Sequence, residues 1–303
     1  MTEKLGYIGL GIMGGPMVDR LLDADEDVTV WNRSREKILP ALEKGAKEAG
    51  SIVELVSSVD IVLMCLTDST AVEFVVFGAD GVASVGPENN TKDKLLVDFS
   101  SMRPNMTRDF AARLKAETGM GWVDAPVSGG AKGAAAGTLA IMAGGEERDI
   151  ERVRPIVEAF SQRFTRMGDS GAGQITKLCN QIIVASNVVT MAEAISFAEK
   201  SGVVDATKLA DALKGGWADS QPFQIMAPRF AARNTDPKIG AANTMLKDLD
   251  TARDFAVETG APLPMTALAS EAFRKLSSMG LGEEDIGEIM TLFDPVEQER
   301  TDT

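Results

Sequence analysis

A lysine and two carboxamide side chains interrupt an apolar stretch near the middle of the chain. The stretch, SGAGQITKLCNQIIVASNVV at residues 170–189, holds Lys177, Asn180 and Gln181. Residues three and four positions apart lie on one face of an α-helix, so these side chains can meet the same ligand. The chain contains no histidine, which is otherwise the most common residue for proton transfer. Lys177 is therefore the best candidate for a general acid or base; the alternative is a polar stripe that faces solvent.

A glycine motif near the N-terminus predicts a dinucleotide site. The segment GLGIMG follows the apolar residues 5–8 and precedes a helical pattern. In G-x-G-x-x-G the first glycine allows a tight turn, the second lets a pyrophosphate approach the backbone, and the third lets helix and strand pack closely. The predicted cofactor-binding residues here are Gly9, Leu10, Gly11, Ile12, Met13 and Gly14. The alternative is a glycine turn with no ligand.

The residues after the second predicted strand bear on which dinucleotide is bound. NAD sites commonly place Asp or Glu there, to hold the ribose 2′-hydroxyl. This chain instead has Asn32, Arg33, Ser34 and Arg35. Asn and Ser can bond a 2′-phosphate and Arg can pair with it through two hydrogen bonds. We therefore expect NADP(H) to be favoured, with NAD(H) bound through Asn32 as the alternative.

A second glycine-containing loop predicts an anion site. Ser128, Gly129 and Gly130 follow the predicted strand 122–127. Open α/β sheets bind ligands at the carboxyl ends of their strands. Backbone N–H groups in such a loop form a nest suited to a carboxylate, and the Ser128 hydroxyl adds a donor. The alternative is a plain turn.

The elements that must hold these residues form an alternating pattern in the first half of the chain. Short apolar runs predict buried parallel strands, and helical patterns lie between them. The predicted strands are residues 5–8, 28–31, 61–66 and 95–99, with 122–125 and 139–143 extending the sheet. This alternation predicts a doubly wound α/β sheet with helices on both faces.

After about residue 164 the pattern becomes helical throughout. We expect a dinucleotide-binding domain over residues 1–164, a long interdomain helix over 165–201, and an all-helical domain for substrate binding and oligomerisation over 202–303. The last residues, 297–303, read as a frayed polar tail.

Composition excludes several classes of function. The formal net charge is −14, with no block of Lys and Arg to follow a phosphate backbone, which argues against nucleic acid and anionic membranes as partners. With no histidine and two cysteines, a zinc site is implausible and we expect no metal. The cysteines, Cys65 and Cys179, lie among apolar residues and read as reduced core thiols. We expect a soluble, cytoplasmic protein.

Five motifs in order resemble the β-hydroxyacid dehydrogenase family, which includes 3-hydroxyisobutyrate dehydrogenase and tartronate semialdehyde (2-hydroxy-3-oxopropionate) reductase. They are GLGIMG, DFSSMRP (98–104), DAPVSGG (124–130) with GAAAGTL after it, GAGQITKLCNQ (171–181) and MLKDLDTA (245–252). The resemblance covers nearly the whole chain. It implies a Rossmann domain, an interdomain helix, and a helical C-terminal domain that helps form homodimers or homotetramers. It also implies an essential lysine, which falls on Lys177.

The resemblance assigns further positions. Ser101 stands where relatives often have Thr near the nicotinamide ribose, and Leu66-Thr67 stands where they usually have Leu-Pro. Lys247 with Asp248 matches a Lys-Asp pair that reaches from the helical domain toward the cofactor; the alternative is a surface ion pair. The SGG loop is where the family binds the substrate carboxylate.

The chain departs from the family beside the lysine. Many members have Asn four residues after it, whereas this chain has Gln181 there and Asn180 one residue earlier. Either carboxamide could orient the substrate, and we favour Asn180 because its shorter side chain is more easily held rigid.

The leading hypothesis is an NADP(H)-preferring enzyme that interconverts a small β-hydroxyacid and its semialdehyde, with 2-hydroxy-3-oxopropionate as the best guess. An unperturbed lysine, with a pKa of about 10.4, is an ammonium ion at neutral pH and suits the reductive direction. The alternative within enzymes is an NAD-dependent 3-hydroxyisobutyrate dehydrogenase. The alternative of another class is a non-catalytic dinucleotide sensor.

Overall fold

A computed structural model describes residues 3–87 and 91–294 of the chain. Contacts divide the chain into two compact units, Met1–Lys177 and Leu178–Thr303, which we call unit 1 and unit 2. The division falls inside a single helix, α8 (Ala172–Lys200). Our assignment of that helix to a separate interdomain segment therefore remains a proposal.

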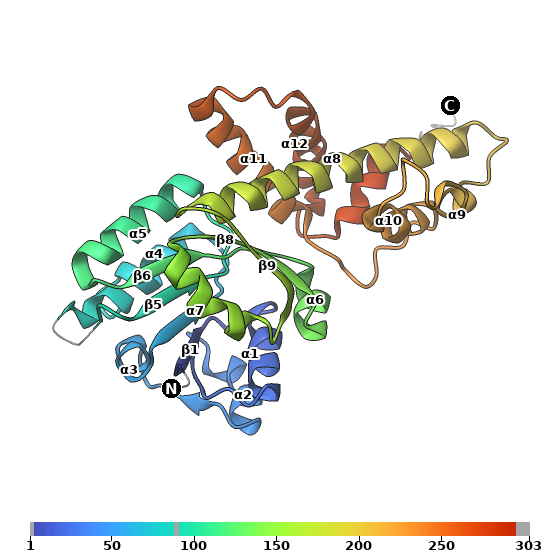
Figure 1. Cartoon of the computed structure of the whole chain (residues 1–303). Helices are drawn as coiled ribbons and strands as arrows, with labels where there is room; N and C mark the ends of the chain where they lie inside the picture. Colours follow the sequence, from blue (N-terminus) through green and yellow to red (C-terminus); the bar gives the residue numbers. More distant parts are fainter. Residues whose placement is uncertain (1–2, 88–90, 295–303) are drawn as a thin grey trace, which may run out of the picture. The chain divides into compact units, whose positions relative to one another are not determined.

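Unit 1 is built around one mixed sheet (Figure 1). Within the described residues the sheet has nine strands: β1 (Leu5–Ile8), β2 (Val28–Trp31), β3 (Lys47–Glu48), β4 (Ile61–Met64), β5 (Leu95–Asp98), β6 (Gly121–Asp124), β7 (Val127–Ser128), β8 (Leu139–Gly144) and β9 (Ser161–Gly168). Their order is β3-β2-β1-β4-β5-β6-β8-β7, with β9 paired to β8. The first six strands in this order, β3-β2-β1-β4-β5-β6, are parallel to one another. The strand order reverses at β1, which lies between β2 and β4, so a switch point lies at its carboxyl end.

Helices cover both faces of this sheet. Consecutive strand residues point to opposite sides, so a strand of apolar residues gives both faces a surface to be buried. Leu63 contributes to the core on one face, and its neighbours Val62 and Met64 contribute to the core on the other. The first core holds side chains of α1 (Gly14–Asp23), α2 (Leu39–Glu43), α6 (Gly130–Ala136) and α7 (Glu147–Val157). The second holds side chains of α3 (Ile52–Ser58), α4 (Ser69–Phe77), η2 (Val82–Val85) and α5 (Pro104–Thr118). A short helical turn, η1 (Arg35–Lys37), follows β2.

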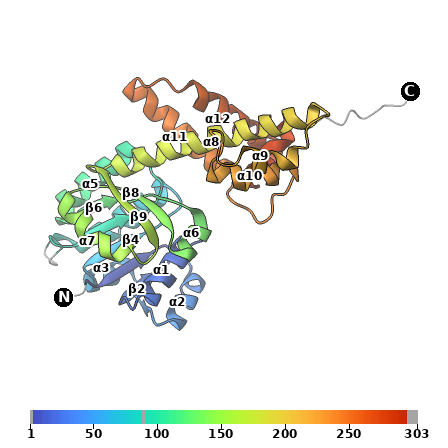
Figure 2. The ribbon, with the colours of Figure 1, turned by 45° about the vertical axis from the view of Figure 1, so that its right-hand side comes forward.

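Unit 2 is helical (Figure 2). Its buried apolar side chains form a core of their own. After α8 the chain forms η4 (Ala206–Lys208), α9 (Leu209–Leu213), α10 (Gln221–Ala231), α11 (Ala242–Thr259), α12 (Pro264–Leu276), η5 (Ser277–Leu281) and η6 (Ile286–Leu292). By length and composition α8 could cross a membrane. Its apolar residues Val188, Ala192 and Ile195 instead lie in the core of unit 2, as in the central helix of a soluble domain.

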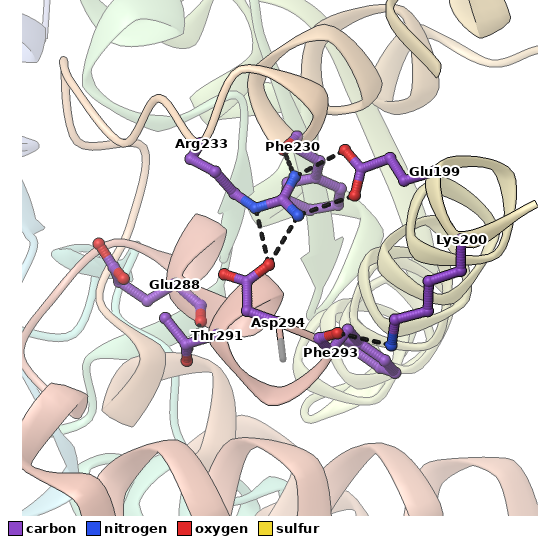
Figure 3. Close-up of polar contacts among 8 residues, drawn as sticks. All are labelled: Glu199, Lys200, Phe230, Arg233, Glu288, Thr291, Phe293 and Asp294. Atoms are coloured by element: carbon purple, nitrogen blue, oxygen red, sulfur yellow. Dashed lines mark hydrogen bonds and ion pairs between the residues drawn. The ribbon is translucent and has the colours of Figure 1, made fainter. Parts of the chain in front are cut away.

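A cluster of polar contacts centred on Arg233 joins distant segments of unit 2 (Figure 3). Its guanidinium donates to both carboxylate oxygens of Glu199 at 2.9 and 2.8 Å and to Asp294 at 3.0 and 2.6 Å. Lys200 Nζ donates to the Phe293 carbonyl at 2.8 Å. The end of α8 is thereby joined to the segment that follows η6.

Several expectations need correction. Residues 165–168, expected in the interdomain helix, belong to strand β9, and the predicted strand 122–127 is two strands, β6 and β7, interrupted at residues 125 and 126. Cys179 is exposed rather than in a core, and Cys65 is partly buried. The predicted tail at 297–303 lies outside the described residues.

Candidate active site

The three glycines of the N-terminal loop stand in three different environments. A Cβ on Gly9, whose φ is +95°, would lie 2.4 Å from the Cys65 carbonyl oxygen. A Cβ on Gly14 would lie 2.0 Å from the Gly9 carbonyl oxygen. A Cβ on Gly11 would meet nothing within 4 Å. The protein's own atoms therefore require glycine at the first and third positions, whereas the space beside Gly11 suits an approaching pyrophosphate.

The residues between these glycines complete a phosphate cradle. Helix α1 begins at Gly14, and its N-cap residue, Met13, provides no side-chain hydrogen bond to the first turn. Gly15 N–H already donates to the Gly11 carbonyl at 3.0 Å and Pro16 has no N–H, so the helix dipole, more than free N–H groups, favours an anion at this end. Ile12 is 83% exposed, whereas Leu10 is buried. The open space beside Gly11 and the exposed Ile12 are thus on the side of the loop where a phosphate group would approach.

The loop after β4 lies beside the glycine loop, as expected at the switch point. Cys65 N donates to the Ile8 carbonyl at 3.0 Å. Leu66 is partly buried and Thr67 is exposed, with its hydroxyl 3.1 Å from Asp68 Oδ2. Both predicted residues therefore lie at the edge of the sheet where open α/β folds bind their ligands.

Some side chains after β2 have hydrogen-bond partners within the protein, and one does not. Asn32 accepts from Leu10 N at 3.0 Å and donates to the Ser34 carbonyl at 2.9 Å, so it fixes the glycine loop to this turn. Arg35 donates to both carboxylate oxygens of Glu48 at 2.7 Å. Arg33 is exposed and has no hydrogen-bond or ion-pair partner among residues 3–87 and 91–294. Arg33 is therefore the guanidinium of this turn that remains for a ligand phosphate.

The loop after β5, which carries Ser101, is held by a buried network. Ser100 Oγ accepts from Leu66 N at 2.9 Å, which joins this loop to the one after β4. Gln174, near the start of α8, donates to the Ser100 carbonyl at 2.8 Å and accepts from Met102 N at 2.9 Å. Ser101 lies between these two bonded residues and is only partly buried.

Two carboxyl groups lie side by side beneath this network, because Asp98 of β5 pairs in register with Asp124 of β6. Asp124 accepts from the backbone N–H groups of Gly171 at 2.7 Å and Gln174 at 3.0 Å, and so caps the start of α8. Burial raises the pKa of Asp124 to about 6, although these N–H bonds oppose the shift. Burial also raises the pKa of Asp98 to about 7, opposed by hydrogen bonds from Ser100 and reinforced by the charge of Asp124.

Lys177 lies beside the predicted carboxylate loop. Its Nζ donates to the Val127 carbonyl at 2.9 Å, and Val127 directly precedes Ser128. Gly129 and Gly130 have φ values of +130° and +63° and are exposed. Both values lie in the left-handed region that favours glycine. Unit 1 therefore brings together the predicted proton donor and the predicted anion loop.

The tyrosine hydroxyl and the cysteine thiol of unit 1, which could also transfer protons, are both buried. Tyr7, the single tyrosine of the chain, has no exposed surface and bonds Met17 Sδ at 3.0 Å; burial raises its pKa. The Cys65 thiol is buried although part of the residue is exposed, and burial raises its pKa to about 12. Both groups stay protonated at neutral pH, which favours Lys177 for this role.

The predicted polar residues of unit 2 form a chain of their own. Asn180 Nδ2 donates to Gln181 Oε1 at 2.9 Å, and Gln181 Nε2 donates to Asp248 Oδ2 at 2.7 Å. Lys247 Nζ lies 3.2 Å from Asp248 Oδ1. Gln181 and Asp248 are buried, whereas the Lys247 side chain is 40% exposed. Gln181 is thus bonded at both ends of its carboxamide.

The two parts of the chain match models of two domains. Residues 4–168 match the NAD binding domain of 6-phosphogluconate dehydrogenase. Residues 171–293 match the NAD-binding domain of NADP-dependent 3-hydroxyisobutyrate dehydrogenase. Together these matches cover most of the chain.

Full-length relatives agree with the domain matches. The chain is 37% identical to 2-hydroxy-3-oxopropionate reductase of Escherichia coli over 279 residues, 91% of this chain and 92% of that protein. It is 33% identical to NAD-dependent L-serine dehydrogenase of Pseudomonas aeruginosa over 303 residues, 97% of this chain and 99% of that protein. The structure of Mycobacterium tuberculosis 3-hydroxyisobutyrate dehydrogenase with L-serine superposes with a TM-score of 0.85 at 30% identity, covering 97% of this chain and 100% of that one.

The chain belongs to the β-hydroxyacid dehydrogenase family. It is an NAD(P)-dependent oxidoreductase that acts on the hydroxyl group of a β-hydroxyacid. The predicted fold class is confirmed: a Rossmann-type sheet domain is followed by a helical domain. The nicotinamide dinucleotide cofactor is likewise confirmed at the level of the class.

Three residues around the site of this β-hydroxyacid dehydrogenase were not predicted from the sequence: Ser100, Asp124 and Gln174. Asp124 caps the start of α8 by accepting from Gly171 N–H, 47 residues further along the chain, whereas capping signals in a sequence are read from the few residues before a helix. Gln174 stands in the GAGQ segment, three residues before Lys177. Its spacing from the lysine places it on the same helix face, and that signal could have identified it.

Proposed function

We propose that this β-hydroxyacid dehydrogenase prefers NADP(H) and interconverts a small β-hydroxyacid and its semialdehyde. In this proposal Lys177 is the general acid and base, and Ser128, Gly129 and Gly130 bind the substrate carboxylate. The observation that carries the proposal is the 2.9 Å hydrogen bond from Lys177 Nζ to the Val127 carbonyl. It holds the ammonium group next to the loop whose backbone suits a carboxylate.

The chemistry follows from these positions. When bound, the nicotinamide exchanges a hydride with the substrate carbon. In the reductive direction Lys177 donates a proton to the carbonyl oxygen, and in the oxidative direction it accepts that proton from the hydroxyl. The SGG loop fixes the carboxylate end, so the reacting carbon is presented in one orientation. Hydride and proton together account for the two hydrogens gained by the aldehyde.

The contacts of Arg33 and Arg35 support the preference for NADP(H). Arg35 is already paired with Glu48, whereas Arg33 is exposed at the end of β2, where the adenosine ribose binds in this class of fold. A guanidinium pairs with a phosphate through two charge-assisted hydrogen bonds. Asn32, which holds the glycine loop, has both ends of its carboxamide engaged.

We propose 2-hydroxy-3-oxopropionate as the substrate, supported by the 37% identity to the reductase that bears this name. The relative that acts on L-serine with NAD supports the alternative of an NAD-dependent enzyme, including a 3-hydroxyisobutyrate dehydrogenase. Turnover of 2-hydroxy-3-oxopropionate, succinic semialdehyde, glyoxylate, methylmalonate semialdehyde, 3-hydroxyisobutyrate and serine, each with both cofactors, separates these candidates. No turnover over this panel would instead favour a dinucleotide sensor.

For the orienting carboxamide we propose Asn180, because Gln181 is bonded to Asn180 and to Asp248. Lys247 remains a proposed cofactor contact. We further propose that the protein is soluble and cytoplasmic. We also propose a homodimer or homotetramer, supported by large exposed apolar side chains on the helices of unit 2, such as that of Phe197, which is 80% exposed.

Replacement of the lysine tests the mechanism. Lys177→Ala should lower kcat by about 10²–10⁴-fold, because a positioned general acid contributes on that scale. Binding of NADPH, measured by fluorescence titration, should remain within a few-fold of wild type. Lys177→Arg is the matched control for charge, and it should also lose activity because a guanidinium does not give up its proton. Retention of activity in either variant would remove Lys177 from the mechanism.

A further inference from the structure

A buried carboxamide on the first turn of α8 holds the loop that carries Ser101. The Gln174 side chain donates to the carbonyl of Ser100 at 2.8 Å and accepts from the N–H of Met102 at 2.9 Å. These are the residues on either side of Ser101. Gln174 is 1% exposed, so water does not compete for either bond.

The same turn of α8 is fixed independently to the sheet. Asp124 at the end of β6 accepts from the backbone N–H groups of Gly171 and Gln174. A Cβ on Gly173 would lie 2.4 Å from the Met142 carbonyl oxygen, so the helix start lies directly against β8. The backbone of Gln174 is therefore immobilised, and its side chain transmits that position to the loop after β5.

Gln174 also connects two regions of the proposed active site. Lys177 follows it by three residues, so both lie on one face of α8. Ser100, which Gln174 holds, accepts from Leu66 N and so joins the loop after β4 to the same assembly. One side chain thus links the proposed acid to two loops at the cofactor edge of the sheet.

We propose that Gln174 is a positioning residue, which sets the place of the Ser101 loop, and with it the nicotinamide end of the cofactor, relative to Lys177. The proposal rests on the proposed function for the role of Lys177, but the hydrogen bonds of Gln174 do not depend on it. Hydride transfer requires the reacting atoms to be held in a near-attack geometry, and a misplacement of about 1 Å can slow a reaction by about 10²-fold.

The test uses Gln174→Met, which keeps the length and burial of the side chain and removes both hydrogen bonds. We expect kcat to fall by about 10- to 100-fold. Binding of adenosine 2′,5′-bisphosphate, which lacks the nicotinamide, should stay within twofold of wild type, while NADPH should bind more weakly. Gln174→Glu is the second variant. It keeps the acceptor for Met102 N and places a carboxylate oxygen against the Ser100 carbonyl. We therefore expect weaker NADPH binding and nearly unchanged bisphosphate binding for this variant too.

Gln224→Met is the matched control. Gln224 in unit 2 donates to the Ala210 carbonyl at 2.9 Å and to Asp219 at 2.7 Å, so this variant also loses two hydrogen bonds of a glutamine. It should lower the unfolding temperature without changing kcat or the ratio of the two dissociation constants. If both Gln174 variants behave like this control, Gln174 has only a structural role and the proposal is wrong.

Failure of the proposed function gives a different result. In that case the wild type turns over no substrate of the panel, whereas the ratio of NADPH to bisphosphate binding still reports on Gln174. A ratio unchanged in Gln174→Met overturns the positioning role, whatever the substrate. A changed ratio in a protein with no turnover supports the positioning role and rejects the proposed reaction.

Discussion

At the scale of single residues, Arg33 and Arg35 offer a test of cofactor preference. Arg35 is bound to Glu48 through two hydrogen bonds, whereas Arg33 has no such partner among the described residues. Arg33→Ala should weaken NADPH binding by about 10- to 100-fold, since a hydrogen bond to a charged group contributes roughly 1.5–3 kcal/mol. NADH binding should change little.

Arg35→Ala is the matched control, because it removes an equal charge two residues away. It should leave the ratio of kcat/KM for NADPH and NADH within a few-fold of wild type. A wild-type enzyme that uses NADH as well as NADPH, with a ratio insensitive to Arg33→Ala, would contradict the preference for NADP(H).

The buried carboxyl of Asp98 predicts how stability depends on pH. Its pKa is raised to about 7 by burial and by the charge of Asp124, whereas an unfolded Asp titrates near 3.9. Between these values the folded protein binds more protons than the unfolded chain, so this stabilising contribution is complete below about pH 4 and is lost as pH rises through about 7. Asp98→Asn should remove it, so that the variant loses less stability than wild type between pH 5 and 8, by roughly 2–4 kcal/mol.

The measurement is the free energy of unfolding of both proteins in denaturant at each pH. Asp124 titrates with the same sign, so the variant keeps part of the slope. Equal slopes in the two proteins would mean that Asp98 ionises normally in the folded state.

Candidate site residues could be named from the sequence more readily than the residues that hold them in place. Lys177 and the glycine loops stand in short patterns that are visible in the sequence itself, and their roles stay predictions. The partners of Gln174 are 74 and 72 residues away along the chain, and a contact of that kind is created by the fold. That Gln181 is bonded at both ends of its carboxamide, to Asn180 and to Asp248, could likewise be seen only in the fold, which brings Asp248 beside it.

At the scale of elements, the glycine loop after β1 predicts two separable effects. A Cβ at Gly11 meets no atom within 4 Å, whereas a Cβ at Gly14 would overlap the Gly9 carbonyl at 2.0 Å. Gly11→Ala should therefore leave the unfolding temperature of the cofactor-free protein within about 2 °C, because it disturbs no packing. It should weaken dinucleotide binding by about tenfold or more, since a methyl group would occupy the space of the pyrophosphate.

Gly14→Ala, in contrast, should lower the unfolding temperature of the cofactor-free protein markedly. Its helix α1 would have to move away from the turn that Gly9 makes. Thermal unfolding with and without NADPH separates the two effects. If Gly11→Ala binds the cofactor as wild type does, the pyrophosphate does not lie against this residue.

The elements that were predicted correctly are those whose sequence carries a continuous apolar run. Strands β1, β4 and β5 are buried along their whole length, and β2 is buried at alternate residues, so all four begin within the predicted runs. Strand β9, SQRFTRMG, was missed because its residues are exposed or only partly buried. It is held by pairing with β8, and such pairing leaves no apolar pattern in the sequence.

At the scale of the whole molecule, charge limits how copies of the chain can associate. The net charge of −14 makes two copies repel unless their contact surface is uncharged. Helix α8 exposes Ile183, Asn187, Thr190, Ala194 and Phe197. Their spacing of four and three residues places these uncharged residues along one side of the helix, as in a helix–helix seam. The exposed Glu193 borders this stripe.

This stripe predicts a variant that dissociates the proposed homo-oligomer. Phe197→Lys places a cation in the stripe, and in a symmetric contact each copy would have to bury it. Light scattering should show the mass of wild type as a multiple of the chain and that of the variant as a single chain. Phe74→Lys is the matched control, because Phe74 on α4 is also strongly exposed, at 69% against 80% for Phe197. It should keep the wild-type mass. A monomeric wild type would reject the proposed homo-oligomer. An oligomer that survives Phe197→Lys but not Phe74→Lys would place the contact in unit 1 instead of on α8.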